Sequence, residues 1–379
     1  MPDLIFEYDV DFLQRFTQTL KQRNYGLLQY LPSQKSWLGS VREHKNLLNI
    51  VRKRKFHLLN SSVNPKVYRI LAGGKQAELL NTLLNACFYN KWTSKKQLTG
   101  ILTGRLIEEA AANKLIVEKN GLCRFTLCFM PFKSYIIALD PYYTYASQFN
   151  GEFSFDDQIW MDIDSVYFAE FLLKYLKNRR FERVLDVGSG SGIDSLIMSK
   201  LTKECTAIDI NERAIKFTQI NALLNGITNI KTRRSNFFDE VDGQYDLIMG
   251  NPWSGDLASG GLEQLPIIAG QLEPFLENDG VCALRLSSYV IRGKDMCYRY
   301  LKNFAYREKF AVEMVAFRYD TQPHRLKIWE KFGVDYCINY FAFLKKSLNS
   351  TMVKKDVSHL RKFFDFLLIY AMRVKYKFF

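Results

Sequence analysis

The stretch Arg183–Gly192, which reads R-V-L-D-V-G-S-G-S-G, decides the fold of this chain. Its first half is a short run of β-forming apolar residues, the pattern of a fully buried strand. A glycine-rich loop follows, made of Gly188, Ser189, Gly190, Ser191 and Gly192. Residues 193–201 then have the apolar stripe of a helix. Glycine permits positive φ and close approach of a ligand to the backbone, so this order predicts a nucleotide pocket at the carboxyl edge of a parallel sheet.

Two acidic residues indicate which nucleotide the pocket takes. Asp186 lies two residues before the loop, and Ile193 stands where a dinucleotide fingerprint has its third glycine. A carboxylate there would repel a pyrophosphate, but it suits a ligand with an ammonium group and no phosphate, such as S-adenosylmethionine (SAM). Asp209 ends a second β-like run, T-A-I-D, seventeen residues after Gly192. An acidic residue at that place can accept hydrogen bonds from both ribose hydroxyls.

The motifs V-L-D-V-G-S-G-S-G and A-I-D-I-N resemble motif I and its partner in class I SAM-dependent methyltransferases. The alternative is another α/β nucleotide-binding fold, such as a dehydrogenase. The resemblance implies that Asp186 and the loop residues Gly188, Ser189, Gly190 and Gly192 hold the methionine end, and that Asp209 holds the ribose. It also implies that Ile210 gives an apolar face to the adenine, that Asn236 accepts from the adenine amino group, and that Phe237 stacks nearby. For the last three, plain loop packing is the alternative.

The resemblance also implies an α/β fold with a seven-stranded, doubly wound, Rossmann-like sheet. The predicted strands are 183–187, 205–209, 228–233, 245–250, 281–286, 311–318 and 335–344. The last two should form an antiparallel hairpin. Between the second and third strands, a helix over 211–225 should be capped by Asn211 and stopped by Gly226.

The 379 residues predict five segments. They are a helical segment 1–65, a winged-helix-like module 66–140, a linker or substrate cover 141–181, the methyltransferase domain 182–346 and a basic, apolar helix 347–379. In the second segment, Thr103 should cap a third helix that ends near Asn113, and Asn120-Gly121 between β-formers predicts a hairpin. The cover is aromatic and locally acidic, from Tyr142 to Trp160.

The net charge of +14 is unevenly distributed. Residues 1–65, 66–130 and 347–379 carry +5, +6 and +5, whereas residues 181–346 are neutral. Basic flanks favour an acidic partner such as nucleic acid, although an exposed, solvated face is the plainer interpretation, also for the cluster V-R-K-R-K at 51–55. The third helix of the module carries Glu108 and Glu109, which suit phosphates poorly, so we expect packing or substrate capping rather than DNA binding. A terminal helix packed on the module or on a second subunit would allow a homodimer.

The cysteines and the lengths of the apolar runs indicate in which cellular compartment the protein is expected. The seven cysteines are scattered without a C-x-x-C pair, which favours a reducing compartment and argues against a zinc site or a disulfide framework. No metal is expected. The N-terminal residues have no signal-peptide pattern, and no apolar run reaches about 18 residues. The expectation is therefore a cytoplasmic protein without a transmembrane span.

A second motif, Y-D-L-I-M-G-N-P-W at 245–253, indicates the chemistry. Asn251, Pro252 and Trp253 resemble the N-P-P-Y/F/W motif of enzymes that methylate amide or exocyclic amine nitrogens, including the glutamine, adenine and guanine methyltransferases. An amide nitrogen is a weak nucleophile, so two acceptors that hold its hydrogens would aim its lone pair at the methyl group. The aromatic residue can stack on the substrate. This sequence has one proline instead of two, and its aromatic residue comes one place early.

We therefore expect a SAM-dependent methyltransferase whose acceptor is a nitrogen of a protein or nucleic acid. The alternative is N- or O-methylation of a small metabolite or natural product, which the aromatic cover favours. A hydroxyl acceptor would need a general base, and His324 in the loop 319–334 is the candidate. A third hypothesis is a protein that binds SAM without turnover.

Overall fold

The structure is a computed structural model, and it describes residues 9–28, 74–141, 158–161, 163–253, 262–320, 326–356, 362 and 365–366. Several predictions from the sequence fall outside these residues. They are the basic cluster 51–55, the aromatic cover between 142 and 157, the candidate base His324 and most of the C-terminal segment beyond 356.

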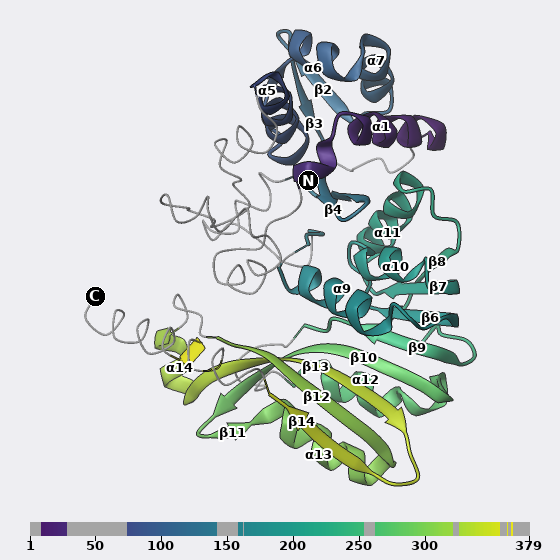
Figure 1. Ribbon diagram of the computed structural model, residues 1–379, viewed down its shortest axis with the longest axis vertical. Coiled ribbons are helices and arrows are strands. Elements are labelled where there is room, and N and C mark those ends of the chain that lie inside the picture. Colours follow the sequence, from purple (N-terminus) through teal and green to yellow (C-terminus); the bar gives the residue numbers. More distant parts are fainter. Residues whose placement is uncertain are drawn as a thin grey trace. The chain divides into compact units, whose positions relative to one another are not determined.

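The described elements alternate between helices and strands along most of the chain (Figure 1). The α-helices are α1 (Val10–Gln22), α5 (Gly74–Leu83), α6 (Lys95–Leu102), α7 (Gly104–Ala112), α9 (Ile163–Leu176), α10 (Ile193–Met198), α11 (Glu212–Leu224), α12 (Leu265–Gln271), α13 (Met296–Glu308) and α14 (Leu326–Phe332). The strands are β1 (Thr93–Ser94), β2 (Ile116–Lys119), β3 (Leu122–Phe125), β4 (Cys128–Phe132), β5 (Tyr135–Leu139), β6 (Phe181–Val187), β7 (Thr202–Asp209), β8 (Ile230–Arg234), β9 (Tyr245–Gly250), β10 (Leu276–Ile291), β11 (Lys294–Asp295), β12 (Phe310–Asp320), β13 (Val334–Lys346) and β14 (Thr351–Lys355). Short non-α turns are Tyr25–Leu28, Leu84–Phe88, which is a π-helix that continues α5, and Glu273–Phe275.

The chain forms two compact units, and neither is one continuous stretch. The first unit comprises Met1–Val166, Gly190–Leu196 and Asn211–Ile230. The second unit comprises Tyr167–Ser189, Ile197–Ile210 and Lys231–Phe379. Part of the glycine loop and all of α11 therefore group with the N-terminal elements. The five segments expected from the sequence stay a prediction.

A mixed sheet has the strand order β14-β12-β13-β10-β9-β6-β7-β8, and β11 pairs with β10 outside this path. Strands β7, β6, β9 and β10 run parallel, and β13 runs antiparallel to both β10 and β12. All seven predicted strands are present, and the predicted final hairpin is β12–β13. The count of seven is wrong, because the described residues form a nine-stranded sheet.

The two additional strands have simple physical origins. β11 is a two-residue return that pairs with the end of β10. β14 lies parallel to the edge strand β12, from Ala311 to Val315, and so covers backbone groups that an edge strand leaves unpaired. The prediction of a helix over 347–379 is therefore wrong for residues 351–355. Its β-branched residues Thr351 and Val353 are compatible with a strand, and pairing with β12 provides the backbone hydrogen-bond partners.

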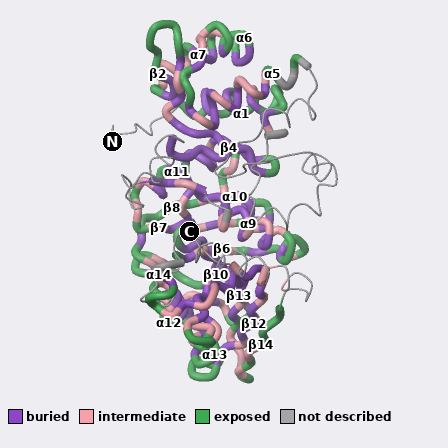
Figure 2. Tube along the Cα trace, turned by 90° about the vertical axis from the view of Figure 1, so that its left-hand side faces the viewer, coloured by how far each residue is buried: buried purple, intermediate pink, exposed green. Residues whose placement is uncertain are grey.

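The core of the second unit lies on both faces of this sheet (Figure 2). On one face, the ring of Phe341 from β13 stacks 3.7 Å from the ring of Phe171 in α9. On the other face, alternate residues of β10 pack with α12 and α13, including Leu284 and Leu301. The sheet is thus buried on both sides where it supports the strand ends that form the site.

Two local features of the N-terminal module, a hairpin turn and a helix N-cap, were predicted from the sequence. Strands β2 and β3 form a hairpin whose last pair is Lys119 with Leu122. The two-residue turn between them, Asn120-Gly121, has φ values of 50° and 73°. Positive φ at both positions is what a type I′ hairpin requires. Thr103 caps α7 by accepting a hydrogen bond from the Leu106 N–H group. Both features confirm the sequence predictions.

Helix α11 substitutes for a neighbouring strand along one edge of β5. The side chain of Asn221 accepts from the Ala138 N–H group at 2.6 Å and donates to the Ala138 carbonyl at 2.9 Å. One turn later, Asn225 makes the same pair of hydrogen bonds with Ile136 at 3.0 and 2.8 Å. A carboxamide has the donor and acceptor of a peptide group, so two asparagines spaced by four residues satisfy alternate residues of an edge strand.

The crossover helix α11 also meets its predicted bounds. Asn211 caps it by accepting from the Arg213 N–H group, and Gly226 follows its end with a φ of 65°. Arg213 forms an ion pair with buried Asp140, the residue that follows β5, and Asp140 also accepts a hydrogen bond from the Ile159 N–H group at 2.6 Å. Asp140 therefore joins α11 to Ile159 at the end of β5.

We expect Gly192→Ala to destabilise the protein more than Gly190→Ala. Both glycines have positive φ, 76° and 53°, but a Cβ at 192 would lie 2.8 to 3.0 Å from Thr218, including its Cα, whereas a Cβ at 190 meets nothing within 4 Å. The αL cost of about 1 kcal/mol applies to both, and the backbone clash only to the first. Thermal unfolding of the two variants measures the difference. Equal melting temperatures would show that the Thr218 contact imposes no constraint.

Candidate active site

The glycine loop begins where β6 ends. The N–H groups of Gly188 and Ser189 both donate to the carbonyl of Ile208 in β7, at 2.9 Å. Gly188 has a φ of 75°, a conformation that glycine adopts without strain. These bonds hold the turn after β6 against the end of β7, so that the first glycine lies beside Asp209.

A cavity of about 210 Å³ opens at this edge of the sheet, within the second unit. Its walls are the carboxyl ends of β6, β7 and β9, the loop after β8 and the start of α12. The lining residues are Val187, Gly188, Ile208, Asp209, Ile210, Ser235, Asn236, Phe237, Asn251, Pro252, Trp253, Gln264 and Ile268. Clefts at the carboxyl ends of parallel strands are the usual ligand sites of open α/β sheets.

The loop after β8 is closed by its own hydrogen bonds. Ser235 donates to the Phe237 carbonyl at 2.8 Å and accepts from the Glu240 N–H group at 3.0 Å. The Ser235 N–H group donates to the Asp209 carbonyl at 3.0 Å, which joins this loop to the end of β7. Phe237 is held at a φ of 49°, and Asn236 donates from Nδ2 to Asp239 at 3.1 Å. Both Asn236 and Phe237 line the cavity.

The N-P-W motif leaves the sheet directly after β9. Gly250 fits closely there, because a Cβ would lie 3.0 Å from the carbonyl oxygen of Val187 in β6, tighter than most Cβ contacts. Asn251 is half-buried, Pro252 is buried and the Trp253 side chain is 62% exposed. The Trp253 N–H group donates to Gln264 Oε1 at 2.8 Å. The backbone of the motif is therefore fixed at both ends while its indole ring faces outward.

The charge of this cavity is simple. Among the described residues that line it, Asp209 is the single ionisable side chain, and no lysine, arginine or histidine is present. Apolar side chains from Ile208, Ile268 and Phe237 form much of the remaining wall. A phosphate-bearing ligand would therefore meet a carboxylate without a compensating cation, whereas a nucleoside with free ribose hydroxyls would meet an acceptor.

The structure brings eight of the twelve predicted site residues to this cavity: Gly188, Asp209, Ile210, Asn236, Phe237, Asn251, Pro252 and Trp253. The other four do not line it. Asp186 is 1% exposed within β6, and Ser189 is buried behind the first turn of the loop. Gly190 and Gly192 belong to the first unit. The roles assigned to all twelve residues stay predictions.

Three lining residues, Ser235, Gln264 and Ile268, were not predicted from the sequence. Ser235 forms hydrogen bonds within its own loop. A single serine in the sequence does not predict such bonds. Gln264 directly precedes α12. It accepts a hydrogen bond from the backbone of Trp253, which lies eleven residues earlier in the sequence. Ile268 follows Gln264 by one helical turn, so it could have been found once Gln264 was known.

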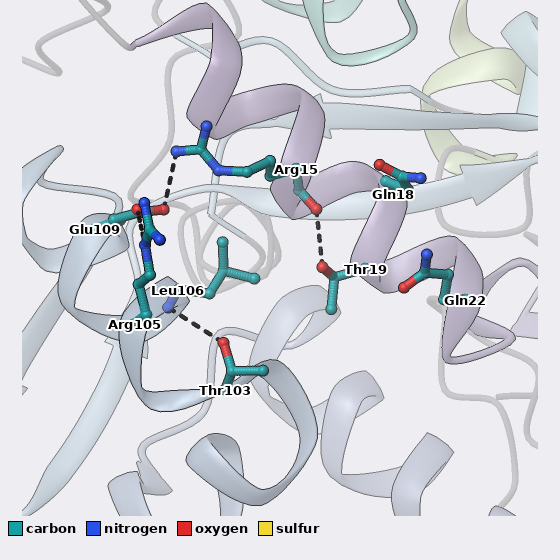
Figure 3. A pocket seen from close by; sticks show the side chains of 8 residues that line it. All are labelled: Arg15, Gln18, Thr19, Gln22, Thr103, Arg105, Leu106 and Glu109. Atoms are coloured by element: carbon teal, nitrogen blue, oxygen red, sulfur yellow. Dashed lines mark hydrogen bonds and ion pairs between the residues drawn. The ribbon is translucent and has the colours of Figure 1, made fainter.

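A second cavity, of about 250 Å³, lies between α1 and the start of α7 in the first unit (Figure 3). Gln18, Thr19 and Gln22 line it from α1. Glu109 of α7 forms ion pairs with Arg15 at 3.1 Å and with Arg105 at 2.9 Å. The two arginines of this cavity therefore face a carboxylate of the same module, and α1 lies along the third helix of that module.

Among the described residues, no group of three or more His, Cys, Asp or Glu side chains is arranged to hold a metal ion. Of the helices in the described ranges, none has the length and apolarity needed to cross a membrane. All seven cysteines are buried and unbridged, and burial raises the pKa of the Cys297 thiol to about 12.

Residues 160–255 match the family model of the methyltransferase small domain. A similar protein is the release factor glutamine methyltransferase of Fusobacterium nucleatum, 38% identical over 93 residues, which are 24% of this chain and 26% of that protein. Another is the ribosomal protein L11 methyltransferase of Thermotoga neapolitana, 38% identical over 82 residues, or 21% and 30% of the two chains. The chain thus spans less than a third of the length of these relatives.

Among solved structures, Trm5b from Pyrococcus abyssi matches 75% of this chain and 82% of its own, with 16% identity and a TM-score of 0.42. The family model and the curated relatives confirm the predicted resemblance to SAM-dependent methyltransferases for the part of the chain that holds the glycine loop and the N-P-W motif. They also support an α/β methyltransferase fold with a mixed central sheet.

We expect Asp209→Ala to weaken SAM binding about ten- to a hundredfold, because hydrogen bonds to a charged acceptor contribute about 1.5 to 3 kcal/mol. Asp242→Ala is the matched control, since Asp242 is exposed and forms its ion pair with Arg233 away from this cavity. Isothermal titration of both variants with SAM measures the effect. If Asp209→Ala binds SAM as tightly as the control, the carboxylate has no role in holding the ribose.

Proposed function

We propose that this protein transfers a methyl group from SAM to a nitrogen atom of a protein or nucleic acid. The observation that carries the proposal is the cavity at the sheet edge. Its described lining residues combine one carboxylate, no basic side chain and the N-P-W motif. A phosphorylated cofactor fits this lining poorly, and a nucleoside joined to a sulfonium amino acid fits it well.

The lining residues suit the parts of SAM in turn. Asp209 would accept from the ribose hydroxyls, and Asn236 Oδ1 from the adenine amino group. Ile210, which is 59% exposed, and Phe237 would cover the adenine ring. The methionine end would lie at the glycine loop, whose strand carries Asp186. When bound, SAM supplies an electrophilic methyl group on its sulfonium sulfur.

Asn251 and Pro252 would orient the acceptor. The side-chain oxygen of Asn251 and the carbonyl of Pro252 would accept the two hydrogens of an amide or aryl amine, which holds the nitrogen lone pair in line for attack. One nitrogen proton leaves after transfer. Trp253 would stack on the acceptor and tolerate its developing positive charge. The hydrogen bond from its N–H group to Gln264 fixes the backbone direction of a motif that has only one proline.

The acceptor class is proposed from relatives and from charge. The two curated relatives are named for a release factor and a ribosomal protein, so both act on proteins of translation. The basic flanks of this chain extend the candidates to nucleic acid. Methylation of a small metabolite is the second candidate, favoured by the aromatic sequence from Tyr142 to Trp160.

We propose that the module of α5, α6, α7 and the sheet β1-β3-β2 is winged-helix-like. The order helix, short strand, two helices and a hairpin supports this proposal. Its third helix, α7, lies against α1 and carries the Glu109 ion pairs (Figure 3). A helix engaged in this way suits substrate capping better than insertion into a DNA groove.

The outer face of the sheet β1-β3-β2 is the better candidate for contact with nucleic acid. The strand register places Arg124 and Val117 in one row of this face and Leu122 and Lys119 in the next, and Trp92 directly precedes β1. Trp92, Val117 and Leu122 are each 40 to 46% exposed, and the Arg124 guanidinium lies 5.7 Å from the Trp92 ring. Aromatic and basic side chains on one sheet face are typical of surfaces that stack bases and neutralise phosphates.

A reducing compartment, such as the cytoplasm, is proposed because all seven cysteines are buried thiols. The raised pKa of Cys297 keeps that thiol protonated, so the folded state loses stability as pH rises above the ordinary thiol range of the unfolded chain.

A homodimer stays a prediction, and sedimentation would test it.

Transfer of label from methyl-labelled SAM to cell extract tests the reaction and its acceptor class together. We expect label in macromolecular material with the wild-type protein. Asn251→Ala should lose at least about a hundredfold in rate while SAM affinity stays within about threefold, since the amide acts on the acceptor. Label found only in solvent-extractable material would contradict the macromolecular acceptor. A parallel loss of SAM affinity would show that Asn251 serves the donor.

Binding to a fluorescent single-stranded RNA of 20 nucleotides tests the outer sheet face. We expect Trp92→Ala and Arg124→Ala each to weaken binding about three- to tenfold, because stacking on an aromatic ring contributes about 1 to 3 kcal/mol per base. Arg105→Ala is the control, because it removes a similar charge from a different surface of the module. Equal effects of all three changes would show that the face has no specific role.

A further inference from the structure

We propose that Asn221 is a positioning residue for the glycine loop, and that it couples the binding of the methyl donor to the placement of β5. The proposal rests on the proposed function, because it assumes that the loop binds SAM. Asn221 is absent from the recognised motifs, and it lies in the last turn of α11, within the first unit.

The Asn221 amide joins two segments that are distant in sequence. Its Nδ2 group donates to the Ser191 carbonyl of the glycine loop at 2.8 Å and to the Ala138 carbonyl of β5 at 2.9 Å. Its Oδ1 oxygen accepts from the Ala138 N–H group at 2.6 Å. Nδ2 has two hydrogens, so each carbonyl takes one. The side chain is fully buried, and both hydrogens are committed to named partners.

Thr218 supports the same loop from the preceding turn of α11. Its hydroxyl lies 3.4 Å from the Gly190 carbonyl, and its side chain fills the space that a Cβ at Gly192 would need. The carbonyls of two successive loop residues, Gly190 and Ser191, are thus both held by buried side chains of one helix. The conformation of the loop depends on α11 as well as on its own glycines.

Holding these carbonyls determines where the loop presents its donors. In a trans peptide, the carbonyl of one residue and the N–H group of the next point in opposite directions. With the Gly190 and Ser191 carbonyls directed at α11, the N–H groups of Ser191 and Gly192 face away from that helix. Backbone N–H groups so arranged suit the carboxylate of a methionine moiety. Loss of the Asn221 donor would free the Ser191–Gly192 peptide to rotate.

Asn225 provides a matched comparison within the same helix. It makes the same two hydrogen bonds with β5, to Ile136, and its Nδ2 group also donates to the Asn221 carbonyl at 2.8 Å. Among the described residues, no hydrogen bond joins Asn225 to the glycine loop. Asn221 is fully buried and Asn225, the C-cap residue, is half-buried, and of the two it is Asn221 whose amide donates to the glycine loop.

The test compares Asn221→Asp with Asn225→Asp in the full-length protein. Each change keeps the side-chain shape and an acceptor and removes both amide hydrogens. We expect both variants to lower the melting temperature, but only Asn221→Asp to raise the Kd for S-adenosylhomocysteine, by about tenfold or more, in isothermal titration. Thr218→Val, which removes one long hydrogen bond, should raise the Kd for S-adenosylhomocysteine about two- to threefold.

Two results would overturn the proposal. One is an unchanged Kd for Asn221→Asp, and the other is an equal rise for Asn225→Asp, which would indicate a general effect of loosening β5. Failure of the wild-type protein to bind the ligand would instead refute the proposed function. Should Asn221→Asp not fold, hydrogen exchange of the wild-type protein decides. Ligand binding should slow exchange at the Ala138 amide, and an unchanged rate there contradicts the coupling.

Discussion

The site depends on the close approach of two strand ends, β6 and β9. The last residue of β9 is Gly250, and any larger residue would place its Cβ 3.0 Å from the carbonyl of Val187. This contact sets the N-P-W motif beside the first turn of the glycine loop. The cavity that results contains a carboxylate and apolar walls, and its rim has the two oxygens proposed to hold an acceptor. The pairing of β6 with β9, together with the small residue at position 250, thus brings the proposed donor and acceptor groups to the same strand ends.

The strands and the pocket were predictable because local rules determine them. A buried parallel strand needs a continuous apolar run, and a strand-to-helix turn near a ligand needs glycine, so Arg183–Gly192 defined both. Asp209 and Asn251 followed from the rule that ligands bind at the carboxyl ends of such strands. The extra strand β14 was missed, because its T-M-V-K-K sequence is polar and pairs only with an edge. Gln264 and Ser235 were missed because their roles arise from contacts across loops.

The asparagines of α11 show a further limit of sequence interpretation. A helix ending in N-A-L-L-N gives no indication that both amides satisfy an edge strand eighty residues earlier. Such pairing is visible only when the backbone partners are known. It also explains why α11 and part of the glycine loop group with the N-terminal elements. The loop that should bind the donor is held by the same helix that holds β5.

The central claim is that this cavity selects a sulfonium nucleoside over a phosphorylated one, and ligand selectivity tests it most directly. Isothermal titration of the full-length protein with SAM, NAD and ATP, each at equal concentration and ionic strength, gives the comparison. The account predicts saturable binding of SAM and no measurable heat from NAD or ATP. Binding of NAD or ATP with SAM ignored would contradict it.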